Sequence, residues 1–411
     1  TDAEPGRLRR RGSLRRQTAI PDDPFTAVLE QRAEEFEAEL VRNPIEPSPP
    51  DPEIMHRVRM FAANHPGTCI VRYFPDGKWI SAFVVRGQSL DVVRCGRAET
   101  IARLAAAMPT DRAPGRREAK AMWTHTLRAI WPYVGADDLA HLVVVPTDDM
   151  FTIPLQLAHV DEDRMRPLGA VVPLSFSVSA TAFVSRARHL LRHQAVDDHD
   201  DLAAVVLPDT TVTGDELIGN GWKADRIVIA GTPPPGLPGD ATVHPGTWEG
   251  MARLAECKPE FFVYAGHGNI VKGSELGPYL WLDNDIITQF DVALRVRLPR
   301  NKLTVIGACL AGQGAQSGGG EVAGFLRSLM AAGAGAIALP LWSVVDGEIV
   351  RTIRALLSAS RRAAGNGGGI FDVVGALHSH YVDANGTPSF RDRRLSADVV
   401  RAETMPLALY L

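Results

Sequence analysis

Cysteine is scarce in this chain of 411 residues, which has only Cys69, Cys95, Cys257 and Cys309. So few thiols do not make a disulfide framework, and because none are spaced as Cys-x-x-Cys, no zinc site is expected. No apolar run reaches the roughly 18–20 residues that a membrane helix needs. No secretory signal is expected either, because the first apolar cluster is short and follows an arginine run. These absences favour a reducing, cytoplasmic location, without a membrane partner, metal or organic cofactor.

A net positive charge is confined to the first 16 residues. Six arginines fall between Arg7 and Arg16, which gives that segment a charge of about +4 within a net charge of −4. The remainder is mildly acidic, so no direct contact with nucleic acid is expected. The arginine run itself is read as a solvated tail, with a docking segment for an acidic partner or a processing site as alternatives.

The chain divides into three parts by composition and periodicity. Residues 1–52 are predicted to hold a basic disordered tail, a short helix over 25–42 and a linker with five prolines in 43–52. Residues 53–135 are predicted to form a helix over 53–64, an antiparallel meander (69–74, 79–86, 89–94) and helices over 100–108 and 118–133.

In residues 136–411, short apolar runs alternate with helical patterns, which is typical of a doubly wound, mostly parallel sheet flanked by helices. The expected strands are 142–145, 203–207, 226–229, 261–264, 303–306 and 335–339. The expected helices are 180–193, 247–257, 320–332, 348–364 and 371–382.

Two of these strands end in a turn of small residues that presents one reactive side chain. Phe261–Tyr264 is followed by Ala-Gly-His267-Gly268, and Leu303–Ile306 is followed by Gly-Ala-Cys309. Open α/β sheets place their chemistry beyond the carboxyl ends of their strands, so neighbouring strands would bring His267 and Cys309 together.

That pair of side chains has a chemical meaning. A thiol becomes a strong nucleophile as its thiolate, and a nearby imidazole can take the proton. Gly268 has no Cβ, so its N–H can approach a reacting carbonyl and form an oxyanion hole with the N–H of Cys309. Cys69, Cys95 and Cys257 lack such a setting and are interpreted as packing residues.

The motifs resemble those of the caspase-like CHAT domain, a bacterial relative of caspases and separase. The matching segments are Tyr264–Gly268 (YAGHG), Ala308–Gly312 (ACLAG), Ala332–Asp346, Leu142–Pro146 with Ile153–Leu155, Val172–Ala180, the helical Ala376-Leu377 and the final Ala408–Leu411. The resemblance covers roughly residues 55–411 and includes the order of histidine before cysteine, 42 residues apart. It implies a caspase-like fold and a cysteine endopeptidase with His267 and Cys309 as catalytic residues.

The resemblance also points to two further residues. Trp342 matches a tryptophan of the family and is expected either to pack in the core or to line the substrate cleft. Asp346 is expected to cap the helix that starts near Glu348, or to shape the pocket for the residue before the cut.

A glycine-rich segment, Gly312–Gly320, follows the cysteine directly. Ordering such a segment is entropically costly, so we expect the enzyme to stay inactive until a partner or substrate orders it; a mobile surface connection is the simpler reading. A phosphate-cradling role is disfavoured because the Lys-Ser/Thr of a P-loop is missing.

Relatives of the family are controlled by attached or bound sensor modules. No such module is visible here beyond the tail and the meander, so an activating or sensor protein on another chain is expected, together with a protein substrate. The alternative function is a caspase-like interaction or regulatory module without turnover. A nucleotide-binding α/β switch protein is a weaker alternative.

Overall fold

The computed structural model describes residues 25–42, 53–134, 138–160, 166–193, 202–208, 226–233, 241–270, 277–313, 315–317, 321–344, 346–365, 370–386 and 407–411. The expected tail over 1–24, the linker over 43–52 and the junction near residue 136 lie outside these ranges. Among the described helices, none is long and apolar enough to cross a membrane.

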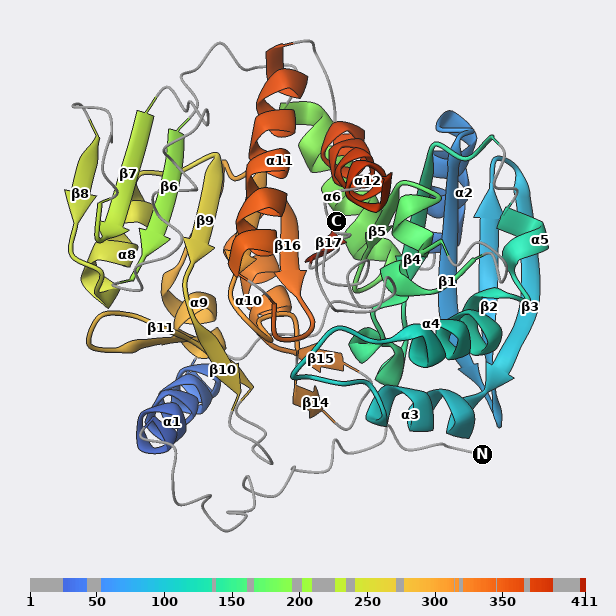
Figure 1. The fold of residues 1–411 in the computed structure, drawn as a ribbon, viewed down its shortest axis with the longest axis horizontal. Helices are drawn as coiled ribbons and strands as arrows, with labels where there is room; N and C mark the ends of the chain where they lie inside the picture. Colours follow the sequence, from blue (N-terminus) through green and yellow to red (C-terminus); the bar gives the residue numbers. More distant parts are fainter. Residues whose placement is uncertain are drawn as a thin grey trace, which may run out of the picture.

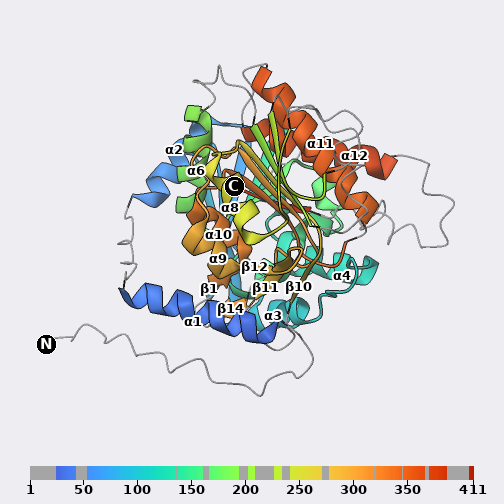
Figure 2. The same cartoon turned by 90° about the vertical axis from the view of Figure 1, so that its left-hand side faces the viewer.

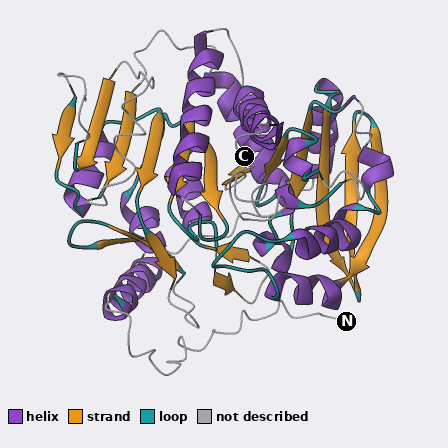
Figure 3. Cartoon of the chain, viewed as in Figure 1, coloured by secondary structure: helices purple, strands orange, loops and turns teal. Residues whose placement is uncertain are grey.

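A twelve-stranded sheet with helices on both faces forms the body of the molecule (Figures 1 and 3). The strand order is β3-β2-β1-β4-β5-β17-β16-β13-β9-β6-β7-β8. The strands are β1 (Thr68–Asp76), β2 (Trp79–Arg86), β3 (Ser89–Arg97), β4 (His141–Val145), β5 (Leu174–Phe176), β6 (Leu202–Leu207), β7 (Arg226–Gly231), β8 (Thr242–His244), β9 (Phe261–Ala265), β13 (Leu303–Gly307), β16 (Ala336–Pro340) and β17 (Leu407–Tyr410).

Figure 2 shows the two helical layers, with α2, α6, α8 and α10 on one side of the sheet and α4, α11 and α12 on the other. The helices are α1 (Thr26–Arg42), α2 (Ile54–Asn64), α3 (Ala98–Ala106), α4 (Arg116–Met122), α5 (Trp131–Val134), α6 (Ala180–His193), α8 (Trp248–Glu256), α9 (Gln289–Arg295), α10 (Phe325–Ala332), α11 (Asp346–Gly365) and α12 (Ile370–Gly386). This is the mostly parallel, caspase-like α/β architecture that the sequence predicts, with the antiparallel meander β1–β3 as one end of the same sheet.

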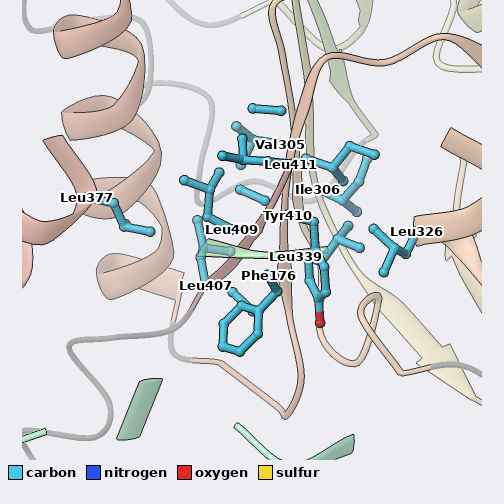
Figure 4. Close-up of a cluster of buried hydrophobic side chains, with 14 of the residues drawn as sticks. Phe176, Val305, Ile306, Leu326, Leu339, Leu377, Leu407, Leu409, Tyr410 and Leu411 are labelled. Carbon is cyan, nitrogen blue, oxygen red and sulfur yellow. The ribbon is translucent and has the colours of Figure 1, made fainter. Parts of the chain in front are cut away.

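The centre of the sheet contains an antiparallel pairing that periodicity did not reveal. β17 runs parallel to β5 but antiparallel to β16, so the two groups of parallel strands point in opposite directions. The side chains of β17 are buried in a cluster with Phe176 of β5, Leu339 of β16 and Leu377 of α12 (Figure 4). Tyr381 of α12 donates from its hydroxyl to the Leu407 carbonyl at 2.7 Å, which ties the strand to the helical layer.

Several local predictions need correction. The helix expected over 320–332 begins at Phe325, because residues 321–323 form β15 (Glu321–Ala323), which pairs with β14 (Ala315–Ser317). The helix expected over 118–133 is interrupted by a π-helical turn (Trp123–Leu127) between α4 and α5. A three-stranded antiparallel sheet, β10 (Gly268–Ile270), β11 (Pro278–Trp281) and β12 (Ile286–Thr288), follows His267 and was not anticipated.

One buried amide joins the starts of three central strands. The Asn301 side chain donates to the carbonyls of Glu260 and Leu303, and accepts from the Thr304 hydroxyl and the Gly335 N–H, all at 3.0–3.2 Å. These partners precede or begin β9, β13 and β16, so Asn301 fixes the strands that carry both motifs. A buried polar group is stabilising only while its partners are present.

Asn301→Ala should therefore lower the free energy of unfolding by about 3 kcal/mol, because it leaves buried backbone groups without partners. Urea denaturation measures the loss, with Asn64→Ala at the exposed end of α2 as the control, expected to change it by less than about 0.5 kcal/mol. Equal stability of the two variants would contradict this role.

Candidate active site

The register of two neighbouring strands brings the histidine and cysteine motifs together. β9 and β13 pair in parallel, with Tyr264 opposite Ile306 and Ala265 opposite Gly307. His267 and Cys309 each follow two residues after the last paired position, at the carboxyl ends of their strands. His267 is exposed to solvent and Cys309 is half-buried, so a substrate can reach both.

Gly268 lies against the backbone of the cysteine. A Cβ at this position would stand 2.8 Å from the Cys309 carbonyl oxygen and 3.0 Å from the Ala308 Cβ. Since contacts with a carbonyl oxygen at this distance are repulsive, any larger residue would push the two turns apart. The glycine after the histidine thus permits the close approach of the two motifs.

The turn that presents Cys309 has an unusual backbone conformation. The next residue, Leu310, has a φ of 62°, in the left-handed region that a non-glycine residue rarely adopts. Gly312 then passes so close to the next strand that a Cβ would meet the Pro340 carbonyl oxygen at 2.9 Å, and its N–H donates to that oxygen at 2.8 Å. This glycine fastens the turn to the end of β16, which explains the spacing of the ACLAG motif.

The segment after β16 forms one wall beside the thiol. The Cys309 sulfur lies 3.9 Å from the Val344 carbonyl oxygen, and the Leu310 N–H donates to the Trp342 carbonyl at 3.4 Å. The Trp342 side chain is 1% exposed, so it packs in the core and presents no surface to a cleft in this structure. Asp346 is the first residue of α11, and so lies within the helix rather than before it; its side chain lies outside the described part of the chain.

A buried tyrosine, Tyr264, contacts the backbone of the turn that carries His267. The Tyr264 hydroxyl lies 2.8 Å from the His267 carbonyl oxygen and 2.6 Å from that of Trp281, while the Trp281 N–H donates to the His267 carbonyl at 3.1 Å. Burial raises the pKa of the Tyr264 phenol well above its usual value, so it remains a hydrogen-bond donor. Tyr264 thereby connects the histidine turn to β11.

Trp281 also contacts the imidazole itself. The two rings meet edge-on, with centroids 5.8 Å apart and planes at 66°. Nothing in the local sequence around Trp281 indicated a role at this site, because the contact depends on the fold-back of β10 and β11. Tyr264 was visible in the YAGHG motif, but its hydroxyl contacts were not.

The other cysteines differ from one another more than the sequence suggested. Cys69 is buried and Cys95 partly buried, and burial raises the pKa of each thiol to about 12. Cys257, which was expected to be a packing residue, is instead exposed where α8 ends.

The fold and the positions of the two reactive residues indicate the family to which the chain belongs. A mostly parallel sheet with helices on both faces, and a histidine and a cysteine at the carboxyl ends of adjacent strands, define a caspase-like α/β protein. The model of the CHAT domain family matches residues 116–368, more than half of the chain, and the chain is a member of that family. Membership in the CHAT family supports cysteine peptidase activity as a possible function.

Several solved structures are similar in fold. The Arg-specific cysteine proteinase gingipain R has a TM-score of 0.44 and 12% identity, over 70% of this chain and 67% of that one. The complex of pro- and mature domains of the Porphyromonas gingivalis enzyme has a TM-score of 0.42 and 13% identity, over 70% and 69%. Saccharomyces cerevisiae separase, in its complex with securin, has a TM-score of 0.49 and 8% identity, over 94% of this chain and 33% of that one. No curated protein matches the chain.

The thiol environments predict a labelling pattern. With a pKa of about 12, only about one thiol in 10,000 is ionised at pH 8, so Cys69 and Cys95 should resist iodoacetamide. The accessible Cys257 and Cys309 should both be alkylated, as peptide mass mapping would show. Rapid alkylation of Cys69 in the native protein would contradict its buried position.

Tyr264→Phe tests how the histidine turn is held. Loss of the hydroxyl should lower the free energy of unfolding by about 1–2 kcal/mol and speed amide exchange at Gly268 and Asn269 by about tenfold, because the turn loses its buried donor. Tyr133→Phe, at an exposed tyrosine, should change neither quantity. Unchanged exchange in Tyr264→Phe would show that the turn is held by other contacts.

Proposed function

We propose that this protein is a cysteine endopeptidase that cleaves a protein substrate through a His267–Cys309 dyad. The observation that carries the proposal is the register of β9 and β13, which sets the two motifs side by side with Gly268 against the Cys309 backbone. Histidine and cysteine in that relation are the parts needed for nucleophilic acyl transfer.

The proposed reaction has two halves. His267 accepts the thiol proton, and the Cys309 sulfur attacks the peptide carbonyl carbon. The N–H groups of Gly268 and Cys309 stabilise the oxyanion. When the C–N bond breaks, His267 gives the proton to the leaving amine and a thioester remains. Water, deprotonated by His267, then attacks the thioester, releasing the acid and returning the thiol.

Control by a second chain is part of this proposal. The nucleophile turn leads directly into β14 and β15, and its conformation includes the left-handed Leu310. A partner that changes the position of this hairpin would act on Cys309 through the few residues between them. Full activity of the purified chain alone on a broad peptide library would remove the need for such a partner.

The alternative is a caspase-like interaction or regulatory module without turnover. Retention of both reactive side chains in accessible positions favours the enzyme. A peptide carrying a thiol-reactive group separates the two, because a peptidase would be labelled at Cys309 much faster than at the exposed Cys257.

Cys309→Ala should abolish cleavage, with a loss of at least about 1,000-fold, because the nucleophile is gone while the fold is retained. His267→Ala should act likewise, and Cys257→Ala should cleave at the wild-type rate. Peptide-library profiling of the three purified variants makes the comparison, with circular dichroism to confirm folding. Turnover by pure Cys309→Ala protein would refute the assignment.

A further inference from the structure

Helix α1 packs against the three-stranded sheet that follows His267, although 225 residues (43–267) separate the helix from that sheet in sequence. Figure 1 shows α1 beside α9 and β10, and both views place it well apart from α2, the next helix in the chain. Leu29 is fully buried in a small apolar cluster with Tyr279 of β11 and Ile286 of β12, and Phe25 and Val28 pack against it.

Charged side chains fix the orientation of α1 on this surface. Arg32 lies 3.8 Å from a carboxylate oxygen of Asp285 and 3.5 Å from one of Asp291, whose side chain is only 2% exposed. Glu35 accepts from the Arg295 guanidinium at 3.2 Å. Exposed ion pairs contribute little, but Asp291 is buried and also caps α9, so this cluster specifies one docking position.

Two aromatic rings, those of Phe25 and Trp281, lead from the start of α1 to the histidine. The ring of Phe25 lies 5.5 Å from that of Tyr279 and 6.2 Å from that of Trp281, and the indole of Trp281 in turn meets the His267 imidazole at 5.8 Å. All three separations fall in the range in which aromatic pairs attract one another. Trp281 is 39% exposed, so Phe25 supplies part of what confines its side chain.

We propose that α1 is a component of the active site, and that Phe25 holds Trp281 against His267 so that the imidazole faces Cys309. This inference rests on the proposed function and adds two positioning residues to it. The main chain at His267 is fixed by Tyr264 and Trp281, but those contacts leave the rotamer of an exposed side chain free. The indole removes that freedom, and Phe25 in turn confines the indole.

The effect should fall on the chemical step more than on substrate affinity. Misorientation of a catalytic group lowers the rate of reaction from the bound state, while the surfaces that bind the peptide are unchanged. A merely structural contact would instead lower the melting temperature without selectively lowering kcat.

The chain offers two phenylalanines for comparison, Phe25 immediately before α1 and Phe36 within it. The ring of Phe36 lies 5.3 Å from that of Phe290 in α9, tilted by 41°, and Phe290 is not among the rings that reach His267. Phe25→Ala removes ring contacts to Tyr279 and Trp281, and Phe36→Ala removes the one to Phe290, so both should lower the melting temperature. Only Phe25→Ala should lower kcat, by about tenfold, with KM within about twofold of the wild type.

Substitutions at Trp281 provide a second, independent measurement. Trp281→Phe retains an aromatic ring and should keep most of the activity, whereas Trp281→Leu should match Phe25→Ala. The double variant Phe25→Ala/Trp281→Leu should be no slower than Trp281→Leu alone, because the two residues act in one chain of contacts. Additive losses would overturn the proposed order of contacts.

The rate of Cys309 alkylation by iodoacetamide separates this inference from the proposed function, because it needs no peptide substrate. Suppose that the wild type cleaves no peptide, and that Cys309 is alkylated more slowly in Phe25→Ala but not in Phe36→Ala. This result would refute the peptidase proposal and support the coupling of α1 to the dyad. Equal kcat and equal alkylation rates in Phe25→Ala and Phe36→Ala would overturn the inference, whether or not peptides are cleaved.

Discussion

The in-register pairing of β9 with β13 is the constraint on which the candidate site depends. Parallel strands have evenly spaced hydrogen bonds, so a one-residue slip would move either reactive turn by about 3.3 Å and reverse the face of every side chain on that strand. The register is held at the amino ends by the buried Asn301 amide and at the carboxyl ends by the close contact of Gly268 with Cys309. One end of the pair is therefore fixed by hydrogen bonds to a buried amide, and the other by a close contact that leaves no room for a Cβ.

Besides the pairing of β17 with its two neighbours, one arginine links the two groups of strands through side-chain-to-backbone contacts. Arg186 of α6 donates to the carbonyls of Met330, Ala334 and Gly335, which end α10 and precede β16. A guanidinium at a helix C-terminus interacts favourably with the helix dipole as well as with the unpaired carbonyls. Arg186 thus fixes α10, and with it β16 and the wall beside Cys309, against a helix from the other group of strands.

Sequence patterns anticipated the parts of the fold that are determined locally. The strands at 203–207, 261–264 and 303–306 are apolar runs that bury both faces, and the helix over 180–193 has a clear apolar stripe; all four have these limits to within a residue. Such patterns cannot show which strands are neighbours in the centre of the sheet, so the antiparallel β16–β17 pairing remained hidden. Short strands such as β11 and β14 were missed because a run of three or four residues is too short to show a period.

The candidate site divides in the same way. His267, Gly268 and Cys309 stand in motifs, and their adjacency followed from two strands with matching ends. The aromatic neighbours of His267 could not be predicted in this way. Trp281 reaches the imidazole because β10 and β11 fold back on each other, and Phe25 reaches Trp281 from a segment some 240 residues away in sequence. An amphipathic pattern over 25–42 predicts a helix but carries no information about the surface on which that helix packs.

The position of β17 has a consequence for how the molecule is assembled during synthesis. Its residues, 407–410, are inserted between β5 and β16, so each group of strands must wait for them before the two can join through the sheet. Contacts of such large sequence separation form late and slowly. The ribosome will have translated both reactive motifs about 100 residues earlier, yet the central pairing cannot close until β17 has emerged. A nascent chain of this protein therefore carries the histidine and the cysteine for some time before the sheet around them is complete.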